Sequence, residues 1–298
     1  MIAETATTPV GIPCPDLSNE DYHADTGAFS ASALEDFRDS RRLFEARYIT
    51  KTLPPKASTP AMELGTCVHL RILEPERYFA TLAEPFPEEA PDGKKWLRRK
   101  GSDHERWWAE EEAKRAGKLA LEQSEIDRIE AIAQSVLAKP WAKALLARDG
   151  QPEFSIFWAD EETGLPLKCR VDWFRPIVSV DLKTTSDATP AKFVRRCVDL
   201  GYHRKRAHYL AGIRAYTADK RARMVHMAVS TDAPYSAGAY ELGDIDRTTN
   251  ASLGLMEWRY ILRSLKHCLD TGDFSDPWER EVLTLEYPTY AFMQQSYL

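Results

Sequence analysis

The sequence predicts a single α/β domain in which a mixed sheet is flanked by helices and preceded by a helical N-terminal extension. Residues 16–150 contain mainly helical patterns, strand-like runs follow at about 152–184, and the elements there run in the order α-β-β-β-α-β. A chain of 298 residues favours one domain, expected over 16–298, with its helical part at 16–150 and its core sheet and C-terminal helices at 151–298. Residues 1–15 are rich in Thr, Ala and Pro, and we expect them to be disordered.

Helix signals recur in the first half of the chain. Ser30-Ala31-Ser32 opens a helix expected to continue to Tyr48, and a second helix is expected over residues 62–73. Ser124-Glu125-Ile126-Asp127 resembles a capping box, and Lys139-Pro140 ends the helix that it opens.

The strand-like runs form one small β unit. Residues 167–174 alternate apolar and polar side chains, and residues 177–185 are an apolar run with a polar end. Because Arg175-Pro176 lies between them as a turn, we expect these runs to pair as antiparallel strands. Other elements are expected as a strand at 153–159, helices at 189–201 and 202–216, strands at 224–230 and 237–242, and a C-terminal helix ending near 269.

Two carboxylates and a lysine lie in this β unit. Asp181 and Lys183 are two residues apart, so their side chains leave a strand on the same face, and antiparallel pairing brings Asp172 back towards Asp181. Phosphodiester hydrolysis needs a hard cation, and paired aspartates suit Mg²⁺ or Mn²⁺. Lys183 could orient or deprotonate the attacking water, or neutralise charge on the phosphate. The pattern predicts a metal-dependent nuclease site, but D-x-K at a strand end is also common as a solvated surface pair.

Four nearby residues have two interpretations each. Arg170 shares a strand face with Asp172, and could pair with the carboxylates or with phosphate. Glu153 could supply another carboxylate at the edge of the site, or be an ordinary glutamate at the start of a strand. Thr184 and Thr185 follow the lysine, where hydroxyls could bind phosphate or belong to a turn.

Charge is distributed unevenly along the chain. The net charge is −6, but residues 192–223 hold ten Lys and Arg residues, among them Arg204 and Arg206, against Asp199 and Asp219. Such a segment could hold a DNA duplex, or only keep helix surfaces soluble. The five cysteines form no C-x-x-C pair and indicate neither a zinc ribbon nor an iron–sulfur cluster. No secretory signal or long apolar span is evident, so we expect a cytoplasmic protein that does not enter a membrane.

A series of short motifs runs along residues 16–218. The motifs are Asp21-Tyr22-His23, residues 29–34, 64–69, 73–78, 153–155 and 163–165, Lys168-x-Arg170-x-Asp172-Trp173, residues 181–188, Tyr202-His203 and Tyr209. Asp172 and Asp181-x-Lys183 resemble the core of PD-(D/E)xK nucleases. The collinear set resembles, more narrowly, the RecE-type (exonuclease VIII) exonuclease domain of phages and prophages.

The resemblance implies roles for individual residues. His69 matches a histidine that joins the carboxylates at the metal, whereas a histidine on a mixed helix is otherwise a core or surface residue. Asp172, Asp181, His69 and the backbone carbonyl of Leu182 are then expected to hold Mg²⁺ or Mn²⁺. Lys183 is expected to position the attacking water.

One position departs from the family pattern. The helix after the lysine strand normally carries Q-x-x-x-Y, and here Lys205 stands at the glutamine position while Tyr209 is kept. The spacing of four puts both side chains on one helical face. Lys205 could compensate a phosphate, compete with the cation or slow turnover.

The resemblance implies a Mg²⁺-dependent exonuclease that degrades linear double-stranded DNA, 5′ to 3′, in phage-type recombination within a bacterial host cell. It also implies a homo-oligomeric ring and a single-strand annealing protein as partner. Two alternatives stay open: a structure-specific or endonucleolytic enzyme of the same superfamily, and a DNA-binding homologue with weakened catalysis.

Overall fold

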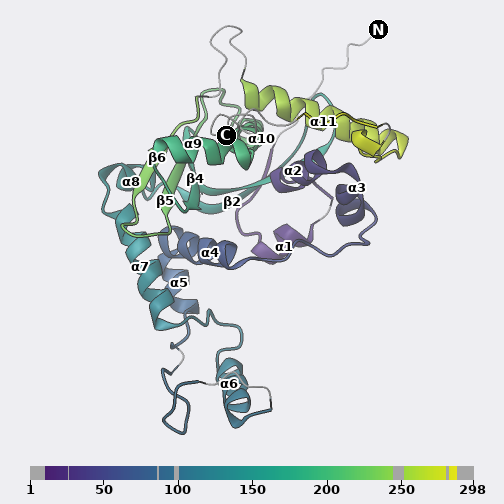
Figure 1. The fold of residues 1–298 in the computed structure, drawn as a ribbon. Helices are drawn as coiled ribbons and strands as arrows, with labels where there is room; N and C mark the ends of the chain where they lie inside the picture. The colour runs from purple at the N-terminus through teal and green to yellow at the C-terminus, as the bar shows by residue number, and fades with distance from the viewer. Residues whose placement is uncertain are drawn as a thin grey trace, which may run out of the picture.

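The structure, a computed structural model, describes residues 11–25, 27–85, 87–96, 101–243, 252–279 and 282–286. A six-stranded sheet in the order β1-β2-β3-β4-β5-β6 lies at the centre, with helices on both faces (Figure 1). Neighbouring strands are antiparallel except β4 and β5, which are parallel, so the predicted mixed sheet is confirmed. The strands are β1 (Ile12–Cys14), β2 (Gln151–Ala159), β3 (Pro166–Phe174), β4 (Val178–Thr185), β5 (Arg223–Ser230) and β6 (Ala237–Tyr240).

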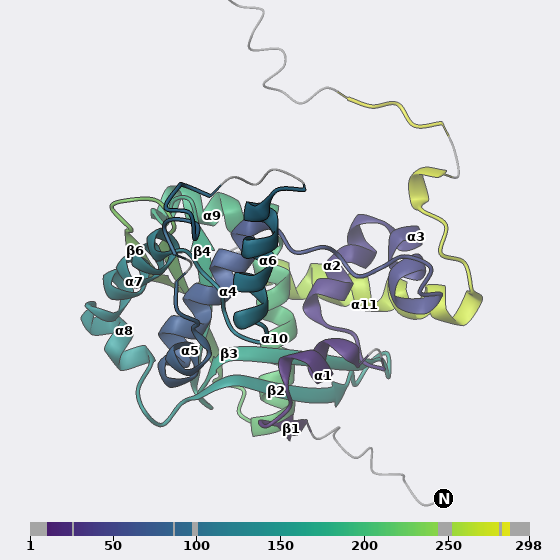
Figure 2. The same ribbon diagram turned by 90° about the horizontal axis from the view of Figure 1, so that it is seen from below.

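The helices divide between the two faces of the sheet. Helices α2, α10 and α11 pack with β2 and β3, whereas α4 and α7 pack with β4 and β5. Seen from below, α4, α5 and α6 lie on the near side of the molecule (Figure 2). The helices are α1 (Asn19–Ala24), α2 (Ala31–Asp39), α3 (Arg41–Phe44), the π-helix η1 (Glu45–Ile49), α4 (Pro60–Leu73), α5 (Pro75–Thr81), α6 (Asp103–Lys114), α7 (Gln123–Leu137), α8 (Pro140–Leu145), α9 (Pro190–Asp199), α10 (Tyr202–Thr217), α11 (Leu253–Thr271) and the 3-10 turn η2 (Pro277–Glu279). No helix in these described ranges is long and apolar enough to cross a membrane.

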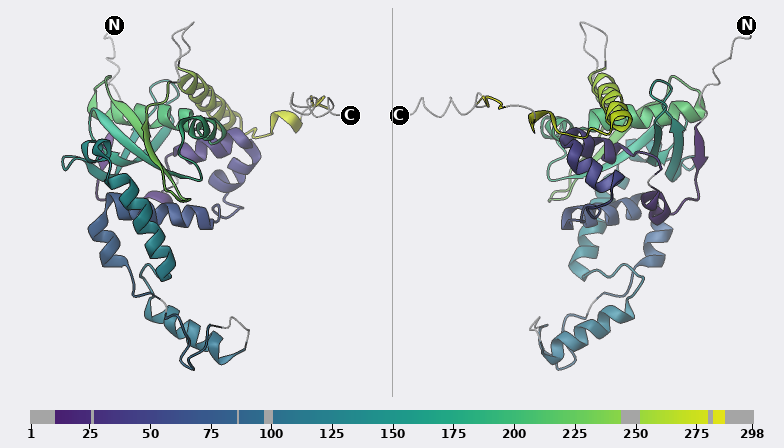
Figure 3. Two further views of the ribbon diagram at one scale, coloured as in Figure 1. Left: turned by 60° about the vertical axis from the view of Figure 1, so that its left-hand side comes forward. Right: turned by 90° about the vertical axis from the view of Figure 1, so that its right-hand side faces the viewer.

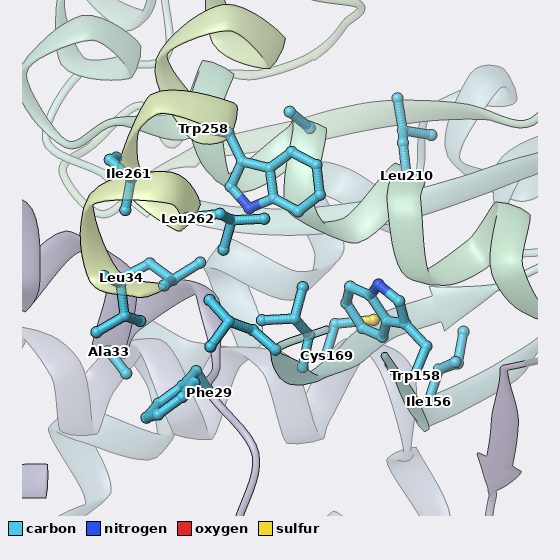
Figure 4. Packing of buried hydrophobic residues seen from close by; sticks show 14 of the residues in the cluster. Phe29, Ala33, Leu34, Ile156, Trp158, Cys169, Leu210, Trp258, Ile261 and Leu262 are labelled. Atoms are coloured by element: carbon cyan, nitrogen blue, oxygen red, sulfur yellow. The ribbon is translucent and has the colours of Figure 1, made fainter. Parts of the chain in front are cut away.

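Two apolar clusters hold the layers together. In the larger one, Trp158 of β2 and Cys169 of β3 meet Leu210 of α10 and Trp258 and Leu262 of α11 (Figure 4). The second joins β4 and β5 to α4 and α7. Burial of apolar surface on both faces is the main force that fixes the strands which carry the candidate site.

A glycine sets the start of α10. Gly201 has a φ of +66°, and a Cβ there would stand 2.4 Å from Oε2 of Glu35. Only glycine fits both the left-handed backbone and this close approach, so α10 can turn directly from α9 and lie across the sheet.

Helix α6 lies at the end of an arm that projects from the body below α5 and α7 (Figure 3). Backbone hydrogen bonds from Ala83 to Leu119 and from Leu119 to Thr81 close its base. The guanidinium of Arg115 donates to the carbonyls of Glu84 and Pro85, which ties the end of α6 to the arm.

Several boundaries differ from the sequence expectations. Disorder was expected for residues 1–15, but residues 12–14 form strand β1, which pairs with β2. Residues 1–10 lie outside the described ranges. The single helix expected from residue 31 to 48 is interrupted at Ser40, whose hydroxyl accepts from the Leu43 N–H and donates to Asp276. The capping box of α7 uses Glu122 with Glu125 rather than Ser124.

Candidate active site

The candidate site forms where β3 and β4 diverge. These strands are antiparallel as predicted, but their register contains one pair, Trp173 with Val180. Beyond it, the backbone N–H of Leu182 donates to Oδ2 of Asp172 at 2.7 Å. A side chain therefore satisfies a buried N–H of β4, and this hydrogen bond fixes the Asp172 carboxylate beside β4.

The alternation of β4 directs Asp181 and Lys183 to one face, as the sequence predicts. Val180 and Leu182 are buried in the cluster with α4 and α7, so the residues between and after them leave on the opposite face. There Nζ of Lys183 donates to Oδ1 of Asp181 at 2.5 Å and to the carbonyl of Leu182 at 3.3 Å. The lysine therefore holds the carboxylate next to it.

A histidine from the next strand holds the other oxygen of Asp181. The parallel register places Asp181 beside His226, and Nδ1 of His226 donates to Oδ2 of Asp181 at 2.8 Å. His226 is 1% exposed, its ring stacks on Tyr202, and no hydrogen bond satisfies its Nε2 within the described part of the chain. Asp181 is thus oriented from both sides.

The charges in this pair favour its ionised state. Burial alone would raise the pKa of Asp181, but the charge of Lys183 and the hydrogen bond from His226 outweigh it and hold that pKa below its ordinary value. Burial would lower the pKa of Lys183, but Asp181 and Asp172 outweigh it and raise that pKa. Lys183 therefore remains an ammonium group.

Three other side chains converge next to this pair. Ligand atoms of His69, Glu153 and Asp172 all lie within 4.8 Å of one another, and Nδ1 of His69 is 3.6 Å from Oδ2 of Asp172. The predicted ligands His69 and Asp172 and the further carboxylate Glu153 thus lie at one point. Asp181 is not a member of this cluster, and its carboxylate accepts hydrogen bonds from Lys183 and His226.

Helix α4 places His69. Thr59 caps its start by accepting from the Met62 N–H, and Pro60 occupies the first turn. One turn before His69, Gly65 lies against β4, where a Cβ would stand 3.1 Å from Oγ1 of Thr184. The missing side chain lets the helix approach the strand closely enough for His69 to reach Asp172.

Glu153 reaches the site through an irregularity in β2. It has a φ of +49°, and the register of β2 with β3 pairs Pro152 and Phe154 but skips the position opposite Asp172. A left-handed conformation is costly for glutamate, by about 1–3 kcal/mol, and such residues concentrate at functional sites. Here it interrupts the ladder at the position where a second carboxylate meets Asp172.

Burial and neighbouring charges shift the pKa values of the three clustered groups, as expected of a site that binds a cation. Burial and the nearby charge of Asp172 raise the pKa of Glu153 to about 7. Burial also raises the pKa of Asp172 to about 7, with Lys183 opposing and Asp181 adding to the shift. Burial and Lys183 lower the pKa of His69 to about 4, so its imidazole is neutral at neutral pH. Two carboxylates and a neutral imidazole are suitable ligands for Mg²⁺ or Mn²⁺, whose charge would relieve the carboxylate repulsion.

Two further predicted residues lie at the site. Tyr209 is half-buried, and burial with the charges of Asp181 and Asp172 raises its pKa well above the ordinary value, so it stays a neutral phenol. Lys205 is also half-buried, and its ammonium lies 5.5 Å from the centre of the Tyr202 ring. Helix α10 carries both residues, and the charge of Asp181 acts on both.

Arg170 does not meet the carboxylates. Its guanidinium donates to Oγ of Ser155 and to the carbonyls of Leu17 and Ser18, and it lies over the ring of Tyr22. The residue fastens the segment before α1 to β3, so the expected contact with the site is not found.

Arg204 is not placed to contact DNA. It is 5% exposed and donates to Glu35 of α2 at 2.9 and 2.7 Å and to Glu257 of α11 at 2.6 Å. Burial of this charge is compensated by the two carboxylates, so Arg204 stabilises the packing of three helices.

The two threonines after Lys183 belong to local structure. The hydroxyl of Thr185 forms hydrogen bonds with the backbone of Asp187, as expected if it belongs to a turn. The hydroxyl of Thr184 lies next to Gly65 of α4.

Part of the charge of the basic segment is paired with carboxylates, and part of it is exposed. Arg221 pairs with Asp219, and Arg223 with Glu241. Lys192, Arg195 and Arg196 lie on the exposed face of α9 and line a shallow hollow with Thr185, Ser186, Asp187 and Asp199. Arg206 is half-buried on α10.

His226 is the main site residue that sequence reasoning missed. The sequence predicts the strand at 224–230. The feature that could have identified His226 is its position between Val225 and Met227, in an otherwise apolar run. A buried polar side chain at such a position needs a partner, but only the parallel register of β4 and β5 identifies it as Asp181.

Comparisons with known proteins agree with this fold. A search of curated proteins found no match. A crystal structure of a protein from Eubacterium rectale described as a "Putative exonuclease" has a similar fold, with a TM-score of 0.57 and 14% identity over 93% of this chain and 98% of that one. The model of the family described as "PDDEXK-like domain of unknown function (DUF3799)" matches residues 30–279. The chain therefore belongs to this family of PDDEXK-like domains.

Proposed function

We propose that this protein is a divalent-metal-dependent DNA exonuclease of the RecE type, which degrades linear double-stranded DNA from its ends. The observation that carries the proposal is the convergence of His69, Glu153 and Asp172 beside the Asp181 and Lys183 pair. Membership of the PDDEXK-like family and the fold shared with a protein described as a "Putative exonuclease" support it.

The donor set fits a hard divalent cation. His69, Glu153 and Asp172 would hold it, with Asp181 and the carbonyl of Leu182 close by as further ligands. A cation such as Mg²⁺ or Mn²⁺ at this point supplies Lewis-acid polarisation of a phosphodiester and a lowered pKa for bound water.

The side chains around this point have separate roles. Lys183, held beside Asp181, stabilises negative charge developing on the phosphate and orients the attacking water. Asp181, held by His226, fixes the position of that ammonium. Tyr209 keeps its phenolic proton and can donate a hydrogen bond.

The RecE resemblance supplies the remaining features of the proposal. These are Mg²⁺ as the natural ion, degradation in the 5′-to-3′ direction, a homo-oligomeric ring, an annealing protein as partner, and a role in phage-type recombination in the bacterial cytoplasm.

The test compares four DNA substrates and two proteins. Linear duplex labelled at the 5′ end, linear duplex labelled at the 3′ end, a covalently closed circle and single-stranded DNA are incubated with Mg²⁺ and with either wild-type protein or Lys183→Ala. We expect early release of mononucleotides from the 5′ label, an intact circle and no product with Lys183→Ala.

Other results would replace the proposal. Cleavage of the closed circle would indicate an endonuclease of the same superfamily. Binding of DNA without product in Mg²⁺ or Mn²⁺ would indicate a DNA-binding homologue with weakened catalysis. Early release from the 3′ label would reverse the proposed polarity.

A further inference from the structure

Lys205 lies close to the candidate site, beside Lys183. Its ammonium and that of Lys183 lie against the same ring, each 5.5 Å from the centre of Tyr202. Among the residues that the structure describes, none forms an ion pair or hydrogen bond with the Lys205 ammonium, which lies over the Tyr202 ring.

The carboxylates around Lys205 already have partners. Glu35 binds Arg204 through both oxygens, and Asp181 binds Lys183 and His226. Burial and the neighbouring Lys183 lower the pKa of Lys205, which means that its charge is not favoured by the protein alone. A half-buried cation beside another cation is unfavourable until an anion arrives.

The charges of the candidate cation ligands and the two lysines leave room for one anion. When ionised, Glu153, Asp172 and Asp181 carry three negative charges, the ammonium groups of Lys183 and Lys205 carry two positive charges, and a divalent cation would carry two more. Within this group, which excludes the ion pairs of Arg204 with Glu35 and Glu257, one positive charge is left, and a phosphodiester carries one negative charge. A neutral residue at position 205 would remove this excess.

We propose that Lys205 is a substrate-binding residue that pairs with a backbone phosphate of bound DNA beside the Asp181 and Lys183 pair. The inference rests on the proposed nuclease function and adds a residue at which this chain departs from the RecE-type pattern. Lys183 is held by Asp181, so Lys205 is the ammonium that is free to move onto the phosphate.

The experiment measures the salt dependence of DNA binding in an inactive background. Asp172→Asn keeps both lysines and removes a cation ligand, so duplex remains intact during fluorescence anisotropy across a series of KCl concentrations. We expect the slope of log K against log[KCl] to be shallower by about 0.9 when Lys205→Gln is added, since one phosphate contact is lost. Lys205→Arg should keep the slope.

Lys220→Gln is the matched control. It removes one positive charge from an exposed lysine beyond the far end of α10, and we expect an unchanged slope. Thermal unfolding of each variant checks that the fold is kept. Titration of the DNA-free, otherwise wild-type protein with Mn²⁺ gives a second readout, in which Lys205→Gln should tighten binding by less than tenfold.

The outcomes separate this inference from the proposed function. If wild-type protein cleaves DNA and Lys205→Gln leaves the slope unchanged, Lys205 does not bind phosphate and only this inference fails. If Lys205→Gln leaves the slope unchanged but tightens Mn²⁺ binding more than tenfold, the lysine acts as a competitor of the cation. If neither Asp172→Asn nor the double variant with Lys205→Gln binds DNA, both the inference and the proposed function are overturned.

Discussion

His226 should contribute to activity even though it is not a member of the cation cluster. Its Nδ1 donates to Oδ2 of Asp181 at 2.8 Å, and its ring is enclosed by Tyr202 and Phe193. His226→Phe keeps an aromatic ring in this space but removes the donor. His226→Asn keeps an amide donor near the position of Nδ1 but removes the ring. The two variants therefore separate hydrogen bonding from packing.

The expected loss of stability is small. Losing a buried hydrogen bond to a charged carboxylate costs about 1.5–3 kcal/mol, but the same change removes the buried Nε2 that has no partner within the described residues, which returns about 1–3 kcal/mol. The two contributions nearly cancel, so the free energy of unfolding of His226→Phe should lie within about 2 kcal/mol of the wild-type value. We therefore expect the variant to be folded in the activity assay.

The expected loss of activity is larger. Residues that orient a metal-site carboxylate typically contribute about 10–100-fold, which corresponds to about 1.4–2.7 kcal/mol of barrier. We expect kcat/KM of His226→Phe to fall by this factor on linear duplex with Mg²⁺, and His226→Asn to retain more activity than His226→Phe. Single-turnover cleavage, together with urea unfolding, measures both quantities on the same preparations.

His208 provides the matched control. It is also a buried histidine, but it bonds to the carbonyl of Lys168 and to the indole N–H of Trp258, away from Asp181. His208→Phe leaves both of these groups without a partner, so it should cost about 2–4 kcal/mol of stability with little effect on kcat. If His226→Phe loses no more activity than His208→Phe, the proposed orientation of Asp181 is refuted.

Three further predictions follow from the packing and the charges. Gly65→Val should push α4 away from β4 and weaken Mn²⁺ binding at least tenfold in calorimetry, because His69 moves with the helix; unchanged binding would contradict this. Because Asp172 and Glu153 keep their protons below a pKa of about 7, Mn²⁺ affinity should fall as the pH is lowered from about 8 to 6, with proton release on binding; carboxyls of ordinary pKa would give no change in that range. Arg204→Met should lower the unfolding free energy by about 2–3 kcal/mol in urea, because it leaves the half-buried carboxylate of Glu35 without its partner, while a variant of wild-type stability would exclude this role.

The parts of the fold that the sequence predicted depend on local patterns. The alternation in β3, the apolar run of β4 and the helix signals around α4 and α10 are set by neighbouring residues, and their bounds were predicted closely. Asp181 and Lys183 share a face because of strand geometry alone. These features need no knowledge of distant contacts.

The parts that could not be predicted depend on segments far apart in the chain. Arg204 looked like a surface cation, and only the approach of α2 and α11 turns it into a buried ion pair. Glu153 had two interpretations until its left-handed backbone placed it opposite Asp172. His226 acquires its partner from the order of the strands, which local propensity does not encode.

The central claim is that His69, Glu153 and Asp172 form one cation site. Anomalous diffraction from crystals of the protein soaked with Mn²⁺ tests it most directly. We predict an anomalous peak between these three side chains, and its loss in Asp172→Asn. A peak at other residues, in crystals of protein that cleaves DNA with Mn²⁺, would contradict the account.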